Sequence, residues 1–189
     1  ECRGFQVEPA FNTARGEHIG PDRNQAEGFI AAFLEALAVA KKHHRGFRYS
    51  AARVHYPVPI FCSAPYDNLT VNPKNDVVAC YEITNQEHDL ASLANIGTVD
   101  EDGLRIFEDK RERLLDLLGA FREDCRDCFC YWSCAGDCFA RTIRRRDDGT
   151  YYKDESRCQI NQTLTKELLL RKIAEGDGVA HLFGEKKQQ

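Results

Sequence analysis

The sequence predicts an α+β protein that begins with a βαβ unit and continues into a small cysteine-rich domain. A strand pattern, a helix pattern and a second strand pattern follow one another within 5–54. Pro57 and Pro59 then interrupt regular structure and indicate a boundary. Beyond them, five of the chain's nine cysteines fall within 125–138, in the stretch CRDCFCYWSCAGDC. These observations separate an N-terminal region from a cysteine-rich one.

The N-terminal region has the order strand, loop, helix, strand. The stretch FQVE (5–8) alternates as a strand does, and Asp22 stands before a helical pattern. Gly46 follows the last helical turn, where we expect a left-handed cap. Residues 47–54 alternate again and predict a second strand. The helix buries a face of apolar residues spaced three and four apart, namely Phe29, Ile30, Phe33, Leu34 and Leu37.

The cysteine-rich region contains short elements. Residues 69–71 and 76–81 flank the turn sequence NPKND and predict a β-hairpin. Residues 104–121 are amphipathic and predict a helix, and 151–152 are expected to begin a strand after the turn DDGT. A last helix is expected over 164–174.

These elements define three regions of the chain. We assign 1–57 to the βαβ region and 58–162 to the cysteine-rich domain with its β-hairpin and helices. We assign 163–189 to a C-terminal helix and tail. The chain contains no methionine, so Glu1 is not expected to be the natural start, and we expect a piece of a larger protein.

Composition argues against several classes of partner. A net charge of −4 and a pI of about 5.9 give no general attraction to nucleic acid or anionic membranes. The basic run 144–146 is followed at once by Asp147 and Asp148, so we expect a solvated loop there. No apolar run approaches the roughly 20 residues of a membrane span. Without a secretion signal, we expect a cytoplasmic protein with reduced thiols.

The cysteine pattern predicts a metal site. Disulfides are disfavoured because the number of cysteines is odd and no export signal is visible. The spacing C-x2-C-x5-C-x3-C over 125–138 concentrates thiols that would repel one another as thiolates unless a metal neutralised them. Thiolate-only ligation leaves zinc and iron–sulfur clusters as the leading choices. Eight cysteines between 62 and 158 suit two four-thiolate sites of either kind, so counting leaves the two choices even.

The order of the cysteines resembles that of the SPASM domain, the C-terminal extension of many radical S-adenosylmethionine enzymes. From Cys62 the chain reads C-x17-C, a gap, C-x2-C-x5-C-x3-C, a gap and a final C. The words CAGDC, CYEI and NIG also lie where such proteins carry similar ones. Two departures are Asn75, where the family has glycine, and Cys130, which is extra. The seven matching positions are Cys62, Cys80, Cys125, Cys128, Cys134, Cys138 and Cys158.

The resemblance implies two auxiliary 4Fe–4S clusters. The first would be held by Cys62, Cys80 and Cys138. The second would be held by Cys125, Cys128, Cys134 and Cys158. Cys130 is then an extra ligand, a thiol beside a cluster, or a small buried hydrophobe. Since the first cluster has three ligands in this pattern, its fourth position would be filled by Cys130 or an unmatched group, or would stay open to substrate.

The resemblance also implies what the N-terminal region is. Such enzymes carry a partial (β/α)6 barrel ahead of the SPASM domain, so 1–57 would be its last βαβ part. The C-x3-C-x2-C motif that holds a third 4Fe–4S cluster with S-adenosylmethionine is absent and would lie upstream. Glu8 follows the first strand and would contact S-adenosylmethionine or substrate, or else serve as a capping carboxylate. The same two alternatives apply to Arg15.

The implied function is that of a maturase that modifies a peptide or protein by radical chemistry. Its partners would be that peptide or protein substrate and an electron donor such as a flavodoxin or ferredoxin, with no nucleic acid and no membrane. This piece alone is expected to be inactive. The alternatives are a zinc-binding protein-interaction module and a ferredoxin-like electron-transfer module without radical chemistry. The ferredoxin spacing, C-x2-C-x2-C-x3-C, differs from the one found here.

Overall fold

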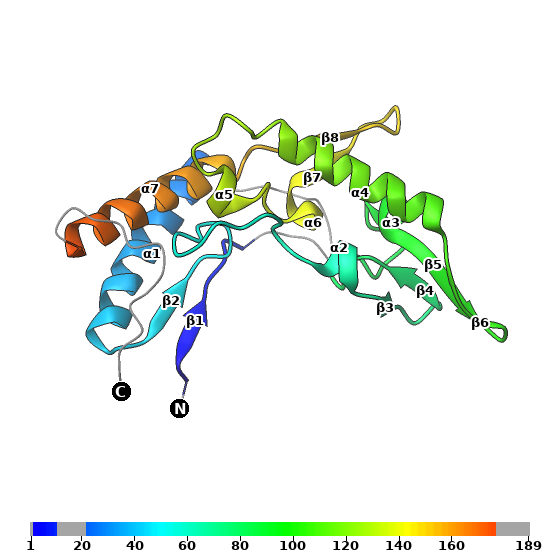
Figure 1. The fold of residues 1–189 in the computed structure, drawn as a ribbon, viewed down its shortest axis with the longest axis horizontal. Coiled ribbons are helices and arrows are strands. Elements are labelled where there is room, and N and C mark those ends of the chain that lie inside the picture. The colour runs from blue at the N-terminus through cyan, green and yellow to red at the C-terminus, as the bar shows by residue number, and fades with distance from the viewer. Residues whose placement is uncertain (1, 11–21, 177–189) are drawn as a thin grey trace.

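The chain has an α+β fold of two lobes joined by a bridging segment (Figure 1). The structure is a computed structural model that describes residues 2–10 and 22–176. Arg15 lies outside the described residues. One lobe holds the first two strands and the two long terminal helices, and the other holds a four-stranded sheet with a helix over it.

The N-terminal lobe contains the predicted βαβ unit. Strands β1 (Gly4–Gln6) and β2 (Gly46–Arg48) pair in parallel, and α1 (Arg23–Lys42) connects them. Asp22 caps α1 as expected: its carboxylate accepts from Gln25 N at 2.8 Å, and the Gln25 side chain accepts in return from Asp22 N. The strands are shorter than the alternating patterns at 5–8 and 47–54 predict.

The expected left-handed cap at Gly46 is wrong. The left-handed residue is His44, with φ of 52°, and Gly46 begins β2 instead. The two glycines of the strand pair face one another closely, since a Cβ on Gly4 would lie 3.1 Å from the Gly46 carbonyl oxygen. Gly46 therefore allows the two strands to approach closely and does not cap the helix.

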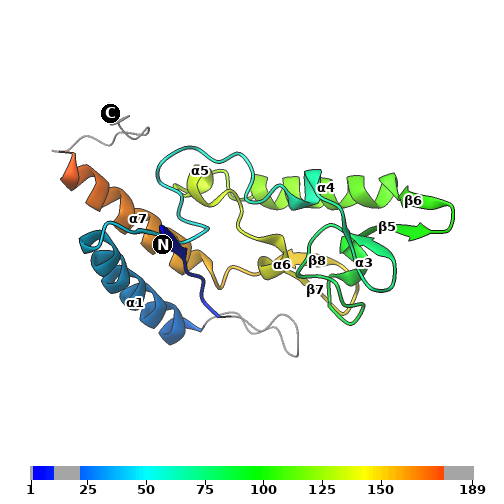
Figure 2. The same ribbon diagram turned by 90° about the horizontal axis from the view of Figure 1, so that it is seen from below.

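The last helix belongs to the N-terminal lobe. Helix α7 (Cys158–Glu175) packs beside α1 (Figure 2), and Ile160 and Leu164 are fully buried in a core with Phe33 and Tyr49. It begins well before the predicted start at 164, so the predicted boundary after 162 falls inside a continuous helix. Its first turns are rich in polar residues, so the sequence there shows no helical repeat of apolar residues.

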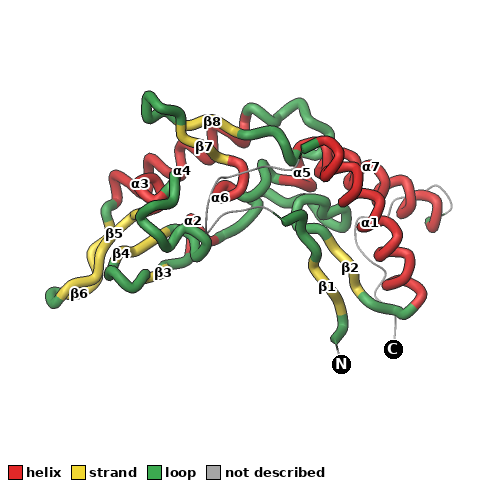
Figure 3. Tube along the Cα trace, turned by 180° about the vertical axis from the view of Figure 1, so that it is seen from behind, coloured by secondary structure: helices red, strands yellow, loops and turns green. Residues whose placement is uncertain are grey.

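The second lobe is built on an antiparallel sheet in the order β3-β4-β5-β6 (Figure 3). The predicted hairpin is confirmed as β3 and β4, but β5 and β6 were not predicted. Residues 104–106 lie in β6, so the helix predicted from 104 begins only at Glu108. Short helices α2 (Ala64–Asp67) and α3 (Ala91–Ala94) flank the sheet. The main elements are β3 (Thr70–Val71), β4 (Asp76–Val78), β5 (Asn95–Asp100), β6 (Gly103–Ile106) and α4 (Glu108–Glu123).

Short elements bridge the lobes. The strand predicted at 151–152 is confirmed as β8, which pairs with β7 around the DDGT turn. The solvated loop predicted at 144–146 is wrong for Arg144, which is 7% exposed and pairs with Asp154 at 3.2 Å. The strand pairing turns this arginine inward, where a carboxylate balances its charge. The bridging elements are α5 (Tyr131–Cys134), α6 (Phe139–Thr142), β7 (Ile143–Arg145) and β8 (Tyr151–Lys153).

Candidate metal centre

The cysteines of the bridging segment and its neighbours fall into two sets. We call Cys62, Cys80 and Cys138 the cleft set, because all three line one open cleft of about 1050 Å³. Cys62 lies just before α2, Cys80 follows β4, and Cys138 immediately precedes α6. Three segments far apart in the sequence thus bring thiols to the same cleft.

Burial raises the pKa values of two thiols of the cleft set. Burial raises the pKa of the Cys138 thiol to about 12, and the charge of Cys80 adds to the effect while Arg141 opposes it. Burial also raises the pKa of Cys80, with Glu82 and Cys62 contributing in the same direction. Thiols in such surroundings are protonated at neutral pH, so a bound cationic group is needed to stabilise them as thiolates.

The remaining cysteines of 125–158 form what we call the helix set. Cys125 and Cys128 lie in the turns after α4, Cys134 ends α5, and Cys158 is the first residue of α7. Burial raises the pKa of Cys158 to about 11, and Cys125 is among the charges that raise it further. Cys134 has a raised pKa from burial, with Asp137, Cys158 and Cys130 adding to it.

Cys130 belongs to the helix set. Its side chain is almost fully buried, at 2% exposure, and its thiol points to the Asn161 carbonyl oxygen at 3.8 Å. Burial raises its pKa, and the nearby thiols of Cys128 and Cys158 contribute to the rise. The sequence left Cys130 open as the missing fourth ligand of the cleft set, but its neighbours are thiols of the other set.

Three side chains donate toward thiols of the helix set. Lys153 Nζ lies 2.8 Å from Cys125 Sγ, and Asn161 Nδ2 lies 3.4 Å from Cys134 Sγ. Gln162 Nε2 lies 3.8 Å from Cys128 Sγ. Burial opposes the charge of Lys153, but its bond to Cys125 leaves the lysine pKa above its ordinary value. Sequence reasoning missed these donors, although Asn161 and Gln162 lie one helical turn after Cys158.

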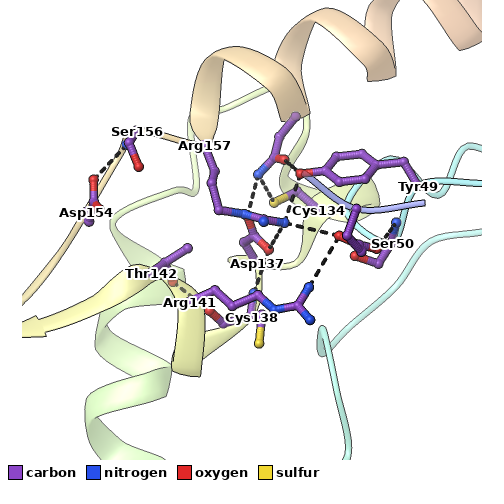
Figure 4. Close-up of polar contacts among 12 residues, drawn as sticks. Tyr49, Ser50, Cys134, Asp137, Cys138, Arg141, Thr142, Asp154, Ser156 and Arg157 are labelled. Carbon is purple, nitrogen blue, oxygen red and sulfur yellow. Dashed lines mark hydrogen bonds and ion pairs between the residues drawn. The ribbon is translucent and has the colours of Figure 1, made fainter. Parts of the chain in front are cut away.

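The turn between Cys134 and Cys138 separates the two sets. Its three residues Ala135, Gly136 and Asp137 are all left-handed, with φ of 51°, 86° and 67°. Such a run is rare for residues other than glycine. It directs the Cys134 and Cys138 side chains different ways (Figure 4): Cys134 accepts from Asn161 of α7, and Cys138 lines the cleft.

A buried ion-pair network, which we call the arginine network, holds this turn (Figure 4). Arg157, 2% exposed, donates from Nε to Asp137 Oδ2 at 2.9 Å and from Nη2 to Tyr49 Oη at 2.9 Å. Asn161 Nδ2 also donates to Asp137 Oδ2, at 2.8 Å. Burial lowers the pKa of Arg157, but Asp137 and its other partners more than offset this and keep it charged. The network joins the turn to both β2 and α7.

Glu8 is part of the same network. Its carboxylate accepts from Ser50 N at 3.1 Å, from Arg141 Nη1 at 3.4 Å and from Arg157 Nη2 at 3.4 Å. These contacts tie the end of β1 to the bridging segment and give Glu8 a structural role. Its contact with S-adenosylmethionine or substrate stays a prediction.

Two features are absent from the described residues. Within 2–10 and 22–176, no group of three or more His, Cys, Asp or Glu side chains stands closely enough to hold a metal ion. Over the same part of the chain, no helix combines the length and apolar character that crossing a membrane requires.

Comparison with known proteins identifies no family for this chain. Protein-family models, curated proteins and solved structures give no match to this chain. A function for the site therefore has to rest on its own residues.

Proposed function

We propose that this chain is the auxiliary-cluster region of a radical S-adenosylmethionine enzyme that modifies a peptide or protein. In this proposal the cleft set and the helix set each hold a 4Fe–4S cluster, and 1–57 is the last part of the catalytic barrel. Glu8 would then stand near S-adenosylmethionine or substrate. The parent protein would draw electrons from a carrier such as a flavodoxin or ferredoxin and would work in the cytoplasm.

The observation that carries the proposal is the division of the thiols. The resemblance to SPASM domains assigns Cys62, Cys80 and Cys138 to one cluster and the other cysteines of the pattern to a second. This division is supported by the three thiols that line the cleft and by the thiols that raise one another's pKa. A parallel βαβ unit precedes the cysteine-rich region, as a barrel end would.

The chemistry of the surroundings fits a cluster that is anionic once its thiolate ligands are counted. Arg53 lies near Cys62 and Cys134, and burial lowers its pKa while these groups raise it. Its Nε and Nη2 are buried and have no hydrogen-bond partner among the described residues, although Nη1 donates to the Phe61 carbonyl oxygen at 3.0 Å. Orphaned N–H groups of this kind are costly unless an acceptor is bound beside them. Thiolates and sulfides of a cluster would supply such acceptors.

The ligand geometry of a four-iron cluster is compatible with separated thiols. Each thiolate binds a different iron, so the four sulfurs surround a volume instead of meeting at one ion. When bound, such clusters supply one-electron transfer, and an open iron offers a site for a substrate group. The chain's own contribution is to bury the thiols, to donate N–H groups to them, and to hold the CAGDC turn through Asp137 and Arg157.

The first experiment is metal analysis of the chain purified without oxygen. We expect about eight iron and eight sulfide per chain, following four of each per cubane cluster, with broad brown absorbance. A colourless sample with stoichiometric zinc would support the interaction module instead. Absence of any metal after anaerobic reconstitution would also contradict the proposal.

Cysteine variants then test the division into sets. Cys138→Ala and Cys158→Ala should each lose about four irons, from the cleft set and the helix set respectively. Cys2→Ala is the matched control, because Cys2 is exposed and its thiol donates to the nearby Gly4 carbonyl oxygen. The ligand assignment is wrong if Cys158→Ala retains all the iron.

A further inference from the structure

The cleft that contains Cys62, Cys80 and Cys138 is strongly basic. Eight lysines and arginines line it, against two glutamates, in a chain whose net charge is −4. The basic residues come from the C-terminal part of α1 and the turn after it, from β2 and the segment that follows, from α6, and from the C-terminal half of α7. Positive charge is therefore gathered in this cleft against the overall charge of the chain.

Part of this charge has no carboxylate partner within 2–10 and 22–176. Lys41 bonds Glu175 across the two long helices, and Arg141 pairs with Glu82 at 2.7 Å. Four other cleft residues have no ion pair with any described residue and are exposed. These four, which we call the basic wall, are Lys42, Arg45, Arg48 and Arg171.

The rest of the lining includes apolar side chains that suit the side chains of a peptide. Leu37, Leu168 and Phe47 line the cleft beside the cations. Two exposed aromatic residues, Tyr56 and Tyr81, line it as well. Cations beside aliphatic and aromatic side chains can contact both the carboxylates and the apolar groups of a peptide. Because exposed rings could also stack on bases, an RNA oligonucleotide is included in the test.

We propose that this cleft binds a peptide segment rich in aspartate and glutamate. The basic wall would pair with the carboxylates, and the apolar lining would contact the side chains between them. The bound segment would thereby be placed in the same cleft as Cys62, Cys80 and Cys138. This inference rests on the proposed function, since it names the class of peptide on which the parent enzyme acts.

The test measures peptide binding by fluorescence anisotropy, using the whole chain purified anaerobically. The probes are a fluorescein-labelled peptide in which Glu and Asp alternate with Leu, and the same peptide with Gln and Asn replacing the acids. We expect the acidic peptide to bind about tenfold more tightly or better, and added salt to weaken it because exposed charges are screened.

Matched variants locate the binding site. The triple variant Arg45→Gln, Arg48→Gln, Arg171→Gln should bind the acidic peptide roughly tenfold more weakly, since each exposed ion pair contributes modestly. The control, Lys110→Gln, Arg113→Gln, Lys166→Gln, removes the same charge from exposed helix positions outside the cleft and should bind like the parent chain. Circular dichroism checks that both triples melt like the parent.

The outcomes separate this inference from the proposed function. Equal binding of the two peptides, equal weakening by the two triples, or tighter binding of an RNA oligonucleotide of the same charge would overturn the inference. Iron is measured on the same samples. Full iron without acidic-peptide binding overturns the inference alone, whereas acidic-peptide binding by a sample that takes up no iron overturns the proposed function alone.

Discussion

At the residue scale, Arg157 is the position outside the thiols at which we expect a substitution to destabilise the fold most. Its guanidinium and the Asp137 carboxylate are each 2% exposed, so neither charge has access to water. A buried ion pair adds little net stability compared with a well-packed apolar pair, but loss of one partner leaves the other charged and buried. Arg157 also begins the turn into α7, directly before Cys158.

We therefore expect Arg157→Met to lower the free energy of unfolding by about 3–5 kcal/mol, because Asp137 is left buried and unpaired. Urea denaturation followed by circular dichroism measures the change. Arg23→Met is the control: its pair with Glu27 is exposed on α1, and exposed pairs contribute about 0.5 kcal/mol. A similar loss in both variants would contradict the structural role given to the arginine network.

Protonation of two histidines makes the free energy of unfolding depend on pH, and their surroundings in the structure determine the sign of this dependence. Burial lowers the pKa of His88 below its ordinary 6.5, and its Nδ1 accepts from Leu90 N at 3.0 Å. Burial and the nearby Lys172 likewise lower the pKa of His55. The folded-state pKa values of both histidines lie below 6.5. The stability that their neutral forms contribute is therefore present above pH 6.5 and is lost as the pH falls below it.

We expect the unfolding free energy to fall between about pH 7 and pH 5.5, and the double variant His55→Gln, His88→Gln to show a flatter slope over this range. Urea titrations at each pH measure it. His43→Gln, at the exposed end of α1, is the control and should keep the parent slope. An unchanged slope in the double variant would show that other groups carry the dependence.

At the element scale, the left-handed CAGDC turn can be probed by paired glycine substitutions. Gly136 has φ of 86°, and a Cβ there would meet Arg122 at an ordinary 3.7 Å, so the cost of a side chain is that of the backbone. Gly136→Ala should lower the unfolding free energy by about 1–2 kcal/mol.

The contrasting variant is Gly119→Ala in the middle of α4, where a Cβ would meet nothing within 4 Å. It should raise the unfolding free energy by about 0.5–1 kcal/mol, because alanine favours helix. Thermal or urea melts measure both. Effects of the same sign would contradict the conformation of the turn.

The elements show what the sequence can and cannot predict. The helix at 23–42 was predictable because its apolar face repeats regularly and Asp22 caps it. Strand β6 was missed because Ile106 fitted a helical face as well as a strand. Residues 158–163 were missed because Ile160 is the only large apolar residue among polar ones, and its burial depends on packing against α1.

The site was predictable to a similar extent. Spacing alone indicated a thiol-rich metal site, but its division into sets needed a family resemblance or the folded arrangement. Lys153 and Asn161 carried no signal of their own, since their contacts to Cys125 and Cys134 arise from the return of the chain after β8. The inward position of Arg144 likewise depends on strand pairing that local charge pattern does not reveal.

At the scale of the whole molecule, the helix set connects the lobes. Its thiols come from the segment after α4, from α5 and from the start of α7, and α7 in turn packs along α1 (Figure 2). The sheet of the second lobe contributes no thiol to this set. A group bound by these thiols would therefore stabilise one lobe's packing more than the other's.

This predicts an uneven response to loss of the helix-set cluster. In Cys158→Ala, amide hydrogen exchange should speed up most over 158–164, because the first turns of α7 lose their fixed end. It should speed up less over α1, which Ile160 and Leu164 still contact in the same core. Amides of β5 and β6 should exchange at the parent rate, since this hairpin is held by its own ladder and the core under α4.

Cys2→Ala is the control and should match the parent exchange rates throughout. Equal acceleration in both lobes would mean that the clusters stabilise the chain as one cooperative unit, and no acceleration over 158–164 would remove Cys158 from the ligand set.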